Sequence, residues 1–183
     1  MTRCPWLPLQ HPLYVEYHDT EWGFPSRDPR YLFECICLEG AQAGLSWWTV
    51  LQKRERYRKV FHQFQPKKVA AMTDEELENL MLDAGIIRHR GKIFSVRQNA
   101  RAWLELDRPV DWLWSFVGGK PIVHDRKTID DFISRSPESD TLSKALRKSG
   151  FNFVGSTTTY AFMQAVGMVN DHTCDCFKKN GVI

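Results

Sequence analysis

The stretch that decides the fold of this chain is LFECICLEGAQAGLSWW, residues 32–48. At the spacing of a buried helix, one face is predicted to carry Phe33, Ile36, Cys37, Gly40, Gly44, Trp47, Trp48 and Leu51. Glu39 lies at the edge of this face, directly before the small residues 40–44. The periodicity favours a core helix broken by glycines, with the acid reaching water. The alternative is a pocket for a flat ligand, which needs an acid, aromatic rings and backbone without bulk.

The composition indicates one globular domain. The chain has 183 residues, of which 43% are hydrophobic and 26% charged, so it is long enough to bury a core. Its formal net charge is only +3, and the basic clusters at 53–59 and 88–92 support phosphate binding only weakly. The seven tryptophans are less ordinary, since many flat side chains suit stacking on a base.

The five cysteines are an odd number and do not follow the spacing of a disulfide scaffold. The first ten residues lack the apolar segment of a signal peptide, and no apolar run approaches the length of a membrane span. We therefore expect a cytoplasmic protein with reduced thiols and no membrane partner. The cysteines are then expected to bind a metal or to be buried.

Helices are predicted for most of the chain, without a set of alternating strands. They span residues 13–18, 30–37, 47–61, 74–84, 90–106, 112–116, 141–149 and 156–168. Pro66 is read as the end of a helical segment. The predicted N-caps are Ser46, Thr73 (in a capping box with Glu76), Asp140, and either Ser156 or Thr157. The helix at 90–106 is expected to bury Ile93, Val96, Ala100, Trp103 and Leu104.

Two histidines and two cysteines near the chain ends form a candidate metal site. His172 and Cys176 stand at i, i+4, and Cys4 with His18 would complete a tetrahedral Cys2His2 zinc set. Neither half has the tight spacing of a zinc finger, so buried thiols and ordinary histidines are the alternative. Cys174 is a competing ligand. Because four protein ligands are available, a structural Zn2+ is favoured over a catalytic one.

The segment between Gly150 and Gly155 reads as a hairpin joining two helices. Glycines let the backbone approach a phosphate, and the first amides of the second helix favour an anion. A purely structural turn is the alternative, since such turns also use glycine.

Several long motifs of the sequence resemble those of a known enzyme family. The chain resembles the bacterial 3-methyladenine-DNA glycosylase I family in LEGAQAGLSW (38–47), DAGIIRHRGKI (83–93), FVGSTTTYAFMQAVGMVNDH (153–172), and in Arg3-Cys4-x-Trp6 and Tyr17-His18-Asp19-x-Glu21-Trp22-Gly23 near the start. The resemblance implies an all-α, helix–hairpin–helix glycosylase fold. It also implies a single domain over 1–183, in which segments 1–30 and 169–183 form a small subdomain at a zinc site of Cys4, His18, His172 and Cys176.

The chain departs from the family pattern in two places. Ala41 stands where the family usually has a glutamine, and the hairpin is Gly-Phe-Asn-Phe-Val-Gly instead of the L-P-G-x-G type of the wider superfamily. That superfamily places a catalytic aspartate after the hairpin, whereas the nearest acid here is Asp171. Because the resembled family works without the aspartate, we expect Asp171 to be a local hydrogen-bonding residue beside the metal ligand.

The resemblance implies a monofunctional hydrolase that excises 3-methyladenine from alkylated double-stranded DNA after flipping the base out. Glu39 would accept hydrogen bonds from the amino edge of the base, and Tyr17 would bind the same edge. Trp47 matches the stacking residue. The remaining pocket walls would be Trp6, Tyr14 and Trp22, for which core packing is the alternative.

Contacts with the duplex would come from Leu45, as a wedge in the gap left by the flipped nucleotide, and from Gly150 and Gly155 in the hairpin. A core leucine is the alternative for Leu45. No lysine stands next to the 38–47 motif to form a Schiff base, so a lyase step is not expected. We expect a monomer. The competing function is a zinc-stapled helical module that binds lesions in DNA without cutting the glycosidic bond.

Overall fold

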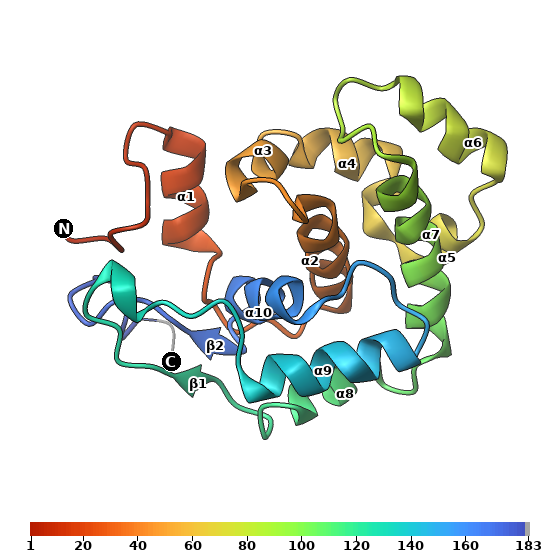
Figure 1. Cartoon of the computed structure of the whole chain (residues 1–183). Helices are drawn as coiled ribbons and strands as arrows, with labels where there is room; N and C mark the ends of the chain where they lie inside the picture. Colours follow the sequence, from red (N-terminus) through yellow and green to blue (C-terminus); the bar gives the residue numbers. More distant parts are fainter. Residues whose placement is uncertain (182–183) are drawn as a thin grey trace.

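The computed structural model describes residues 1–181, and the chain is mostly helical over this range (Figure 1). Its α-helices are α1 (Pro12–Thr20), α2 (Pro29–Gln42), α3 (Trp47–Leu51), α4 (Arg54–Val60), α5 (Pro66–Ala70), α6 (Asp74–Asn79), α7 (Arg90–Glu105), α8 (Pro109–Ser115), α9 (Pro137–Lys148) and α10 (Ser156–Ala165). Short 3-10 turns lie at His62–Phe64, Leu80–Leu82 and Ile129–Asp131. No helix among the described residues is long and apolar enough to span a bilayer.

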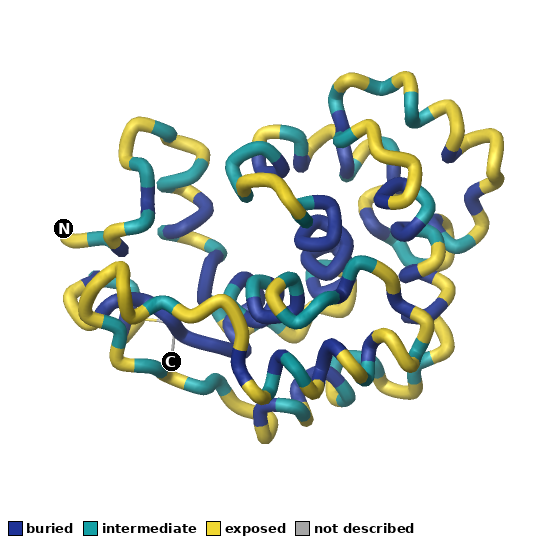
Figure 2. The backbone as a smooth tube through the Cα atoms, viewed as in Figure 1, coloured by how far each residue is buried: buried dark blue, intermediate teal, exposed yellow. Residues whose placement is uncertain are grey.

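Helix α2 is the centre of the molecule, and Figure 2 shows most of its length in dark blue. It begins where the Asp28 side chain accepts hydrogen bonds from the amides of Arg30 and Tyr31. Residues 32–41 are all buried, and the helix packs against α7 and α10. The prediction of one continuous buried face through Leu51 is wrong, because the helix ends at Gln42 and Gly44 turns the chain with φ +76°.

Several predicted boundaries are confirmed. Ser46 caps α3 by accepting from the Thr49 amide, and Thr73 forms the expected capping box with Glu76 at α6. Helix α7 follows its predicted range within one residue and packs along α5. Leu104 is the exception to its predicted buried face, since this side chain is 43% exposed.

Other boundaries differ from the prediction. Pro66 starts α5 instead of ending a helix, because proline is well tolerated in the first turn, where the amide has no partner. The predicted helix over 47–61 is two helices, α3 and α4. Helix α9 begins earlier than Asp140, after a Ser136 cap, and Asp140 instead accepts a hydrogen bond from the Ser156 hydroxyl. Gly155 is the N-cap of α10, in place of Ser156 or Thr157.

The expectation of an all-α chain is also corrected by a small parallel sheet. Strand β1 (Ile122–Val123) pairs with β2 (Val169–Asn170) in the register Ile122↔Val169 and Val123↔Asn170. Two-residue strands are too short to give an alternating pattern in the sequence. The sheet lies beside the first residues of the chain (Figure 1), and the Phe177 amide donates to the Thr2 carbonyl at 3.0 Å. The two ends of the chain are therefore packed together.

The turn after α10 contains Gly167, and a comparison with Gly118 shows how tightly this turn is packed. Both have left-handed φ angles, +71° and +67°. A Cβ on Gly167 would lie 2.3 Å from the backbone of Phe24 and Pro25, whereas a Cβ on Gly118 would meet nothing within 4 Å. We expect Gly118→Ala to lower the free energy of unfolding by about 1 kcal/mol through backbone strain alone. Gly167→Ala should cost about 2–3 kcal/mol more, because backbone must move.

Urea unfolding of the two variants measures this difference. Equal losses of stability would show that the turn after α10 yields to the added methyl group.

Candidate active site and metal centre

A cavity of about 190 Å³ lies between α1, α2, α3 and α10. All six residues predicted to touch the base line it, namely Trp6, Tyr14, Tyr17, Trp22, Glu39 and Trp47. Four further residues complete the lining and were not predicted, namely Gln42, Phe132, Ala161 and Gln164. Gln42, Ala161 and Gln164 lie inside the quoted motifs, so those motifs held a signal for them. Phe132 lies in the least distinctive part of the chain and carried none.

The carboxyl group of Glu39 is the most unusual group in this cavity. Only 4% of the residue is exposed, so the expectation that the acid reaches water is wrong. Its Oε2 atom has no hydrogen-bond partner among the described residues. Burial raises the pKa of Glu39 to about 8, because the charged form loses its hydration. The free protein therefore holds a carboxyl group that a suitable ligand can complete.

Aromatic rings enclose the carboxyl group. Trp6 and Trp22 meet edge to face with centroids 4.7 Å apart, and Tyr17 packs on Trp47 at 5.3 Å. The indole Nε1 atoms of Trp6 and Trp47 are buried without a hydrogen-bond partner among the described residues. Trp48 lies outside the cavity lining and stacks on His11. The cavity thus offers flat apolar walls together with unused polar atoms, an arrangement suited to a planar ligand with a polar edge.

The four predicted metal ligands converge in the core. Cys4, His18, His172 and Cys176 are all buried, and one ligand atom from each lies within 4.8 Å of the others. Cys176 Sγ lies 3.6 Å from His18 Nε2 and 3.5 Å from His172 Nδ1, and Cys4 Sγ lies 3.4 Å from His172 Nδ1. In a tetrahedral zinc site, sulfur and nitrogen ligands stand about 3.6 Å apart.

Hydrogen bonds behind both imidazoles suit the same arrangement. His172 Nε2 lies 3.0 Å from the Trp22 carbonyl, so this nitrogen carries the proton and Nδ1 is left with a free lone pair. His18 Nδ1 lies 2.8 Å from the Asp19 carboxylate, which leaves Nε2 free, and Arg3 holds that carboxylate in turn. Burial lowers the pKa of His172 to about 4, which keeps the ring neutral. The competing ligand Cys174 is exposed and outside the cluster.

The predicted hairpin follows α9. Gly150 has φ +91°, and the Phe151 and Gly150 amides donate to the Leu146 and Arg147 carbonyls, which is a Schellman motif. Gly155 has an ordinary φ of −62° and precedes α10 without a side-chain cap. Only Gly150 of the pair therefore needs glycine for its backbone conformation.

Leu45 follows the Gly44 turn and is 42% exposed, so the alternative of a core leucine is wrong. A second opening connects Leu45 with Glu39 and the first turn of α10 at Thr157 and Thr158. Leu45 thus stands at the mouth of the site and not in its wall.

No lysine is adjacent to the 38–47 motif in the sequence, but the fold brings one next to it. Lys92 Nζ donates to the Ala41 carbonyl at 2.9 Å and to the Ala43 carbonyl at 2.6 Å. These bonds satisfy the last carbonyls of α2 and fix the turn that precedes Leu45. Lys92 does not line the cavity.

Asp171 has the hydrogen-bonding role expected of it. It is fully buried and bonds to His124, Arg126, Tyr160 and Gln164. These bonds outweigh the cost of burial and lower the pKa of Asp171 to about 2.

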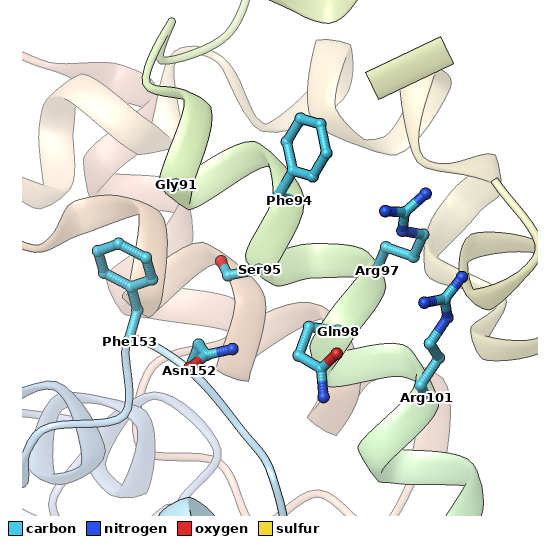
Figure 3. A pocket seen from close by; sticks show the side chains of 8 residues that line it. All are labelled: Gly91, Phe94, Ser95, Arg97, Gln98, Arg101, Asn152 and Phe153. Carbon is cyan, nitrogen blue, oxygen red and sulfur yellow. The ribbon is translucent and has the colours of Figure 1, made fainter. Parts of the chain in front are cut away.

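A larger hollow of about 390 Å³ lies along α7 and beside the hairpin (Figure 3). Phe94, Arg97 and Arg101 extend from α7 on one side, and Asn152 and Phe153 border it on the other. None of the residues that line it carries a buried polar atom without a partner, among those the structure describes. It therefore lacks the unpaired buried polar atoms that mark the smaller cavity.

Comparison with solved structures gives the class of protein. The chain matches a structure of 3-methyladenine DNA glycosylase I with a TM-score of 0.94 at 54% identity, covering 96% of this chain and 98% of the other. It matches a variant of such an enzyme in complex with 3-methyladenine with a TM-score of 0.93 at 36% identity, covering 98% of each. The fold with its enclosed aromatic cavity is therefore that of a DNA glycosylase.

The chain belongs to the methyladenine glycosylase family, whose sequence model matches residues 6–179. It is 55% identical to DNA-3-methyladenine glycosylase 1 of Escherichia coli (strain K12), over 98% of this chain and 99% of that protein.

The raised pKa of Glu39 predicts how stability depends on pH. Because the folded protein keeps this proton to higher pH than the unfolded chain, the wild type loses stability as pH rises between about 4.5 and 8. A Glu39→Gln variant lacks this titration. The difference in unfolding free energy between variant and wild type should therefore shift in favour of the variant, by up to about 1.4 kcal/mol per pH unit.

Urea unfolding of both proteins at several pH values measures the difference. A constant difference over this range would mean that Glu39 titrates near its ordinary pKa.

Proposed function

We propose that this chain hydrolyses the N-glycosidic bond of 3-methyladenine in alkylated double-stranded DNA, as a monofunctional glycosylase. The observation that carries the proposal is the buried Glu39 carboxyl group, which lacks a partner at Oε2 inside an aromatic cavity. A flat base with N–H donors on its edge supplies what this cavity lacks. The 3-methyladenine bound by a structurally similar enzyme is such a base.

Alkylation of the base itself activates the glycosidic bond for cleavage. Methylation at N3 gives the ring a formal positive charge, which weakens the glycosidic bond and makes the base a good leaving group. Trp47 stacks on the flipped base, and aromatic faces attract a cation by about 0.5–2 kcal/mol. Glu39 accepts hydrogen bonds from the amino edge, with Tyr17 at the same edge.

A neutral adenine gains less from this cavity than the alkylated base does. The nearby positive charge favours the ionised form of Glu39, so entry of the cationic base displaces a proton that Glu39 holds in the free protein. Trp6, Tyr14 and Trp22 complete the walls that exclude water. Binding the cation is thus the main contribution of this site to the reaction.

The surface around the cavity mouth suits a bent duplex. Exposed Leu45 acts as the wedge that fills the gap left by the flipped nucleotide. The hairpin from Gly150 to Gly155 leads into α10, which has no side-chain cap, so its first amides are available to a phosphate. Farther along, exposed Arg101 borders the hollow beside the hairpin (Figure 3) and suits the DNA backbone, whereas its neighbour Arg97 is ion-paired with Asp74. Together these elements form a helix–hairpin–helix contact with one strand.

Cys4, His18, His172 and Cys176 are proposed to hold a structural Zn2+. Their spacing, burial and hydrogen-bonded imidazoles fit a tetrahedral site. Zinc there would join residues 1–30 to residues 169–181 as a small subdomain of one glycosylase domain, and residues 182–183 of the predicted subdomain lie outside the described residues. Because four protein ligands fill the coordination sphere, the ion would carry no water for catalysis.

The enzyme is proposed to act in the cytoplasm as a monomer. All five cysteines are unpaired, which suits a reducing compartment.

Excision of the base from methylated DNA tests the activity directly. The wild type should release free 3-methyladenine, detected by chromatography. Glu39→Gln should slow single-turnover excision about 10- to 100-fold, because one buried hydrogen bond to a charged group is lost. Glu16→Gln is the matched control, because Glu16 is an exposed acid on α1.

Binding of methylated DNA without any released base would instead identify a lesion-binding module. Full activity of Glu39→Gln would remove Glu39 from the mechanism.

Metal analysis of the purified protein tests the zinc site. We expect about one equivalent of zinc in the wild type and in Cys174→Ser, and loss of the metal in Cys176→Ser. Cys176→Ser should also unfold at lower temperature, because the binding free energy of the metal contributes to folding. Less than about half an equivalent in the wild type, or equal metal loss in both variants, would contradict the site.

A further inference from the structure

A glutamine of the cavity is held by an acid that lies outside it. Gln164 lines the cavity from α10, and its Nε2 donates to Asp171 Oδ2 at 2.8 Å. Asp171 is fully buried just after β2 and does not line the cavity. Neither residue has a part in the function proposed above. The bond between them nevertheless links the cavity to a buried polar network that includes Tyr160 of α10.

The network fixes the orientation of the Gln164 amide. His124 Nδ1 and Arg126 Nε lie 2.7 and 2.9 Å from Asp171 Oδ1, and the Tyr160 hydroxyl donates to Oδ2 at 2.6 Å. Arg126 also donates to the Tyr160 oxygen at 3.2 Å, so the Tyr160 proton is directed to the carboxylate. A carboxylate surrounded by donors can only accept, and Gln164 must therefore present its NH2 group to it. Its carbonyl Oε1 is the atom left for the cavity.

We propose that Asp171 is a positioning residue that turns the Gln164 carbonyl into the base pocket, where it is a second hydrogen-bond acceptor beside Glu39 and selects bases with an amino group at C6. This inference rests on the proposed function, because it assigns the amino group of the bound base to the Glu39 cavity.

The chemistry of the amino group supports two acceptors. An exocyclic amino group has two N–H donors, of which Glu39 accepts one and Gln164 accepts the other. A base with an oxygen at C6 would set its own acceptor against the Gln164 carbonyl, and buried acceptors without a donor are costly. A site built to bind a donor rejects the analogue that lacks it much more strongly than an apolar wall could. Gln164 therefore determines specificity without taking part in bond cleavage.

Calorimetric titration with free bases tests the proposal. The probes are 3-methyladenine and 3-methylhypoxanthine, which carries an oxygen in place of the amino group. We express the result as the preference, the Kd of 3-methylhypoxanthine divided by the Kd of 3-methyladenine. Gln164→Leu should weaken binding of 3-methyladenine about tenfold and leave 3-methylhypoxanthine nearly unchanged, so the preference falls about tenfold.

Asp171→Asn gives a sharper result. An asparagine amide in place of Oδ2 would donate to Gln164, and the Gln164 side chain would then turn its NH2 group toward the base. The preference should fall at least as far as in Gln164→Leu, with tighter binding of 3-methylhypoxanthine than in the wild type. A loss of stability alone would weaken both bases together. Zinc content and thermal unfolding are measured for each variant, since His172 follows directly in the chain.

Tyr160→Phe is the matched control, because it removes another bond to the same Oδ2 atom and Tyr160 does not line the cavity. Its preference should equal that of the wild type. An unchanged preference in Gln164→Leu, or an equal fall in Tyr160→Phe and Asp171→Asn, would overturn the proposal. Failure of the wild type to bind 3-methyladenine at all would instead overturn the proposed function.

Discussion

The buried carboxyl group of Glu39 is the constraint on which the rest of the site depends. Burying a carboxyl group without a full set of hydrogen bonds costs free energy, and the raised pKa of Glu39 expresses that cost. The surrounding fold must supply the stability, and it does so through α2, which is buried along residues 32–41 between α7 and α10. A ligand that brings N–H donors and positive charge then recovers part of the cost. The free protein is thus arranged for its ligand and not for its own greatest stability.

The Cys/His cluster, formed by Cys4, His18, His172 and Cys176, is the second feature on which the site depends. Cys4 and His18 flank the segment that contributes Trp6 and Tyr17, and both belong to the cluster that lies against the C-terminal segment. The Trp22 ring meets the His172 ring at 4.7 Å. Joining the chain ends therefore also fixes the walls that cover Glu39. The proposed zinc would have no chemical role, and it would hold together the segments that carry these walls.

The sequence predicted most of what depends on local pattern. The Thr73 capping box, the length of α7 and the convergence of the Cys/His cluster follow from spacing alone or from the family motifs. A break at the glycines was expected, but the predicted helix over 30–37 stops short of the end of α2 at Gln42, after which Gly44 turns the chain.

Contacts between distant segments could not be predicted from pattern. The β1–β2 pair joins residues far apart in the chain, and Phe132 reaches the cavity from a segment without a motif. Lys92 and Gln164 lie within the quoted motifs, but their partners are known only once the chain is folded. The family motifs located the site, whereas only the fold explains which polar atoms in it are free.

The most direct test of the central claim is a crystal structure of this protein with 3-methyladenine. We predict that the base stacks on Trp47 in the cavity, with its amino group within hydrogen-bond distance of the Glu39 carboxylate. A base bound instead in the hollow between α7 and the hairpin, or an amino group directed away from Glu39, would contradict it.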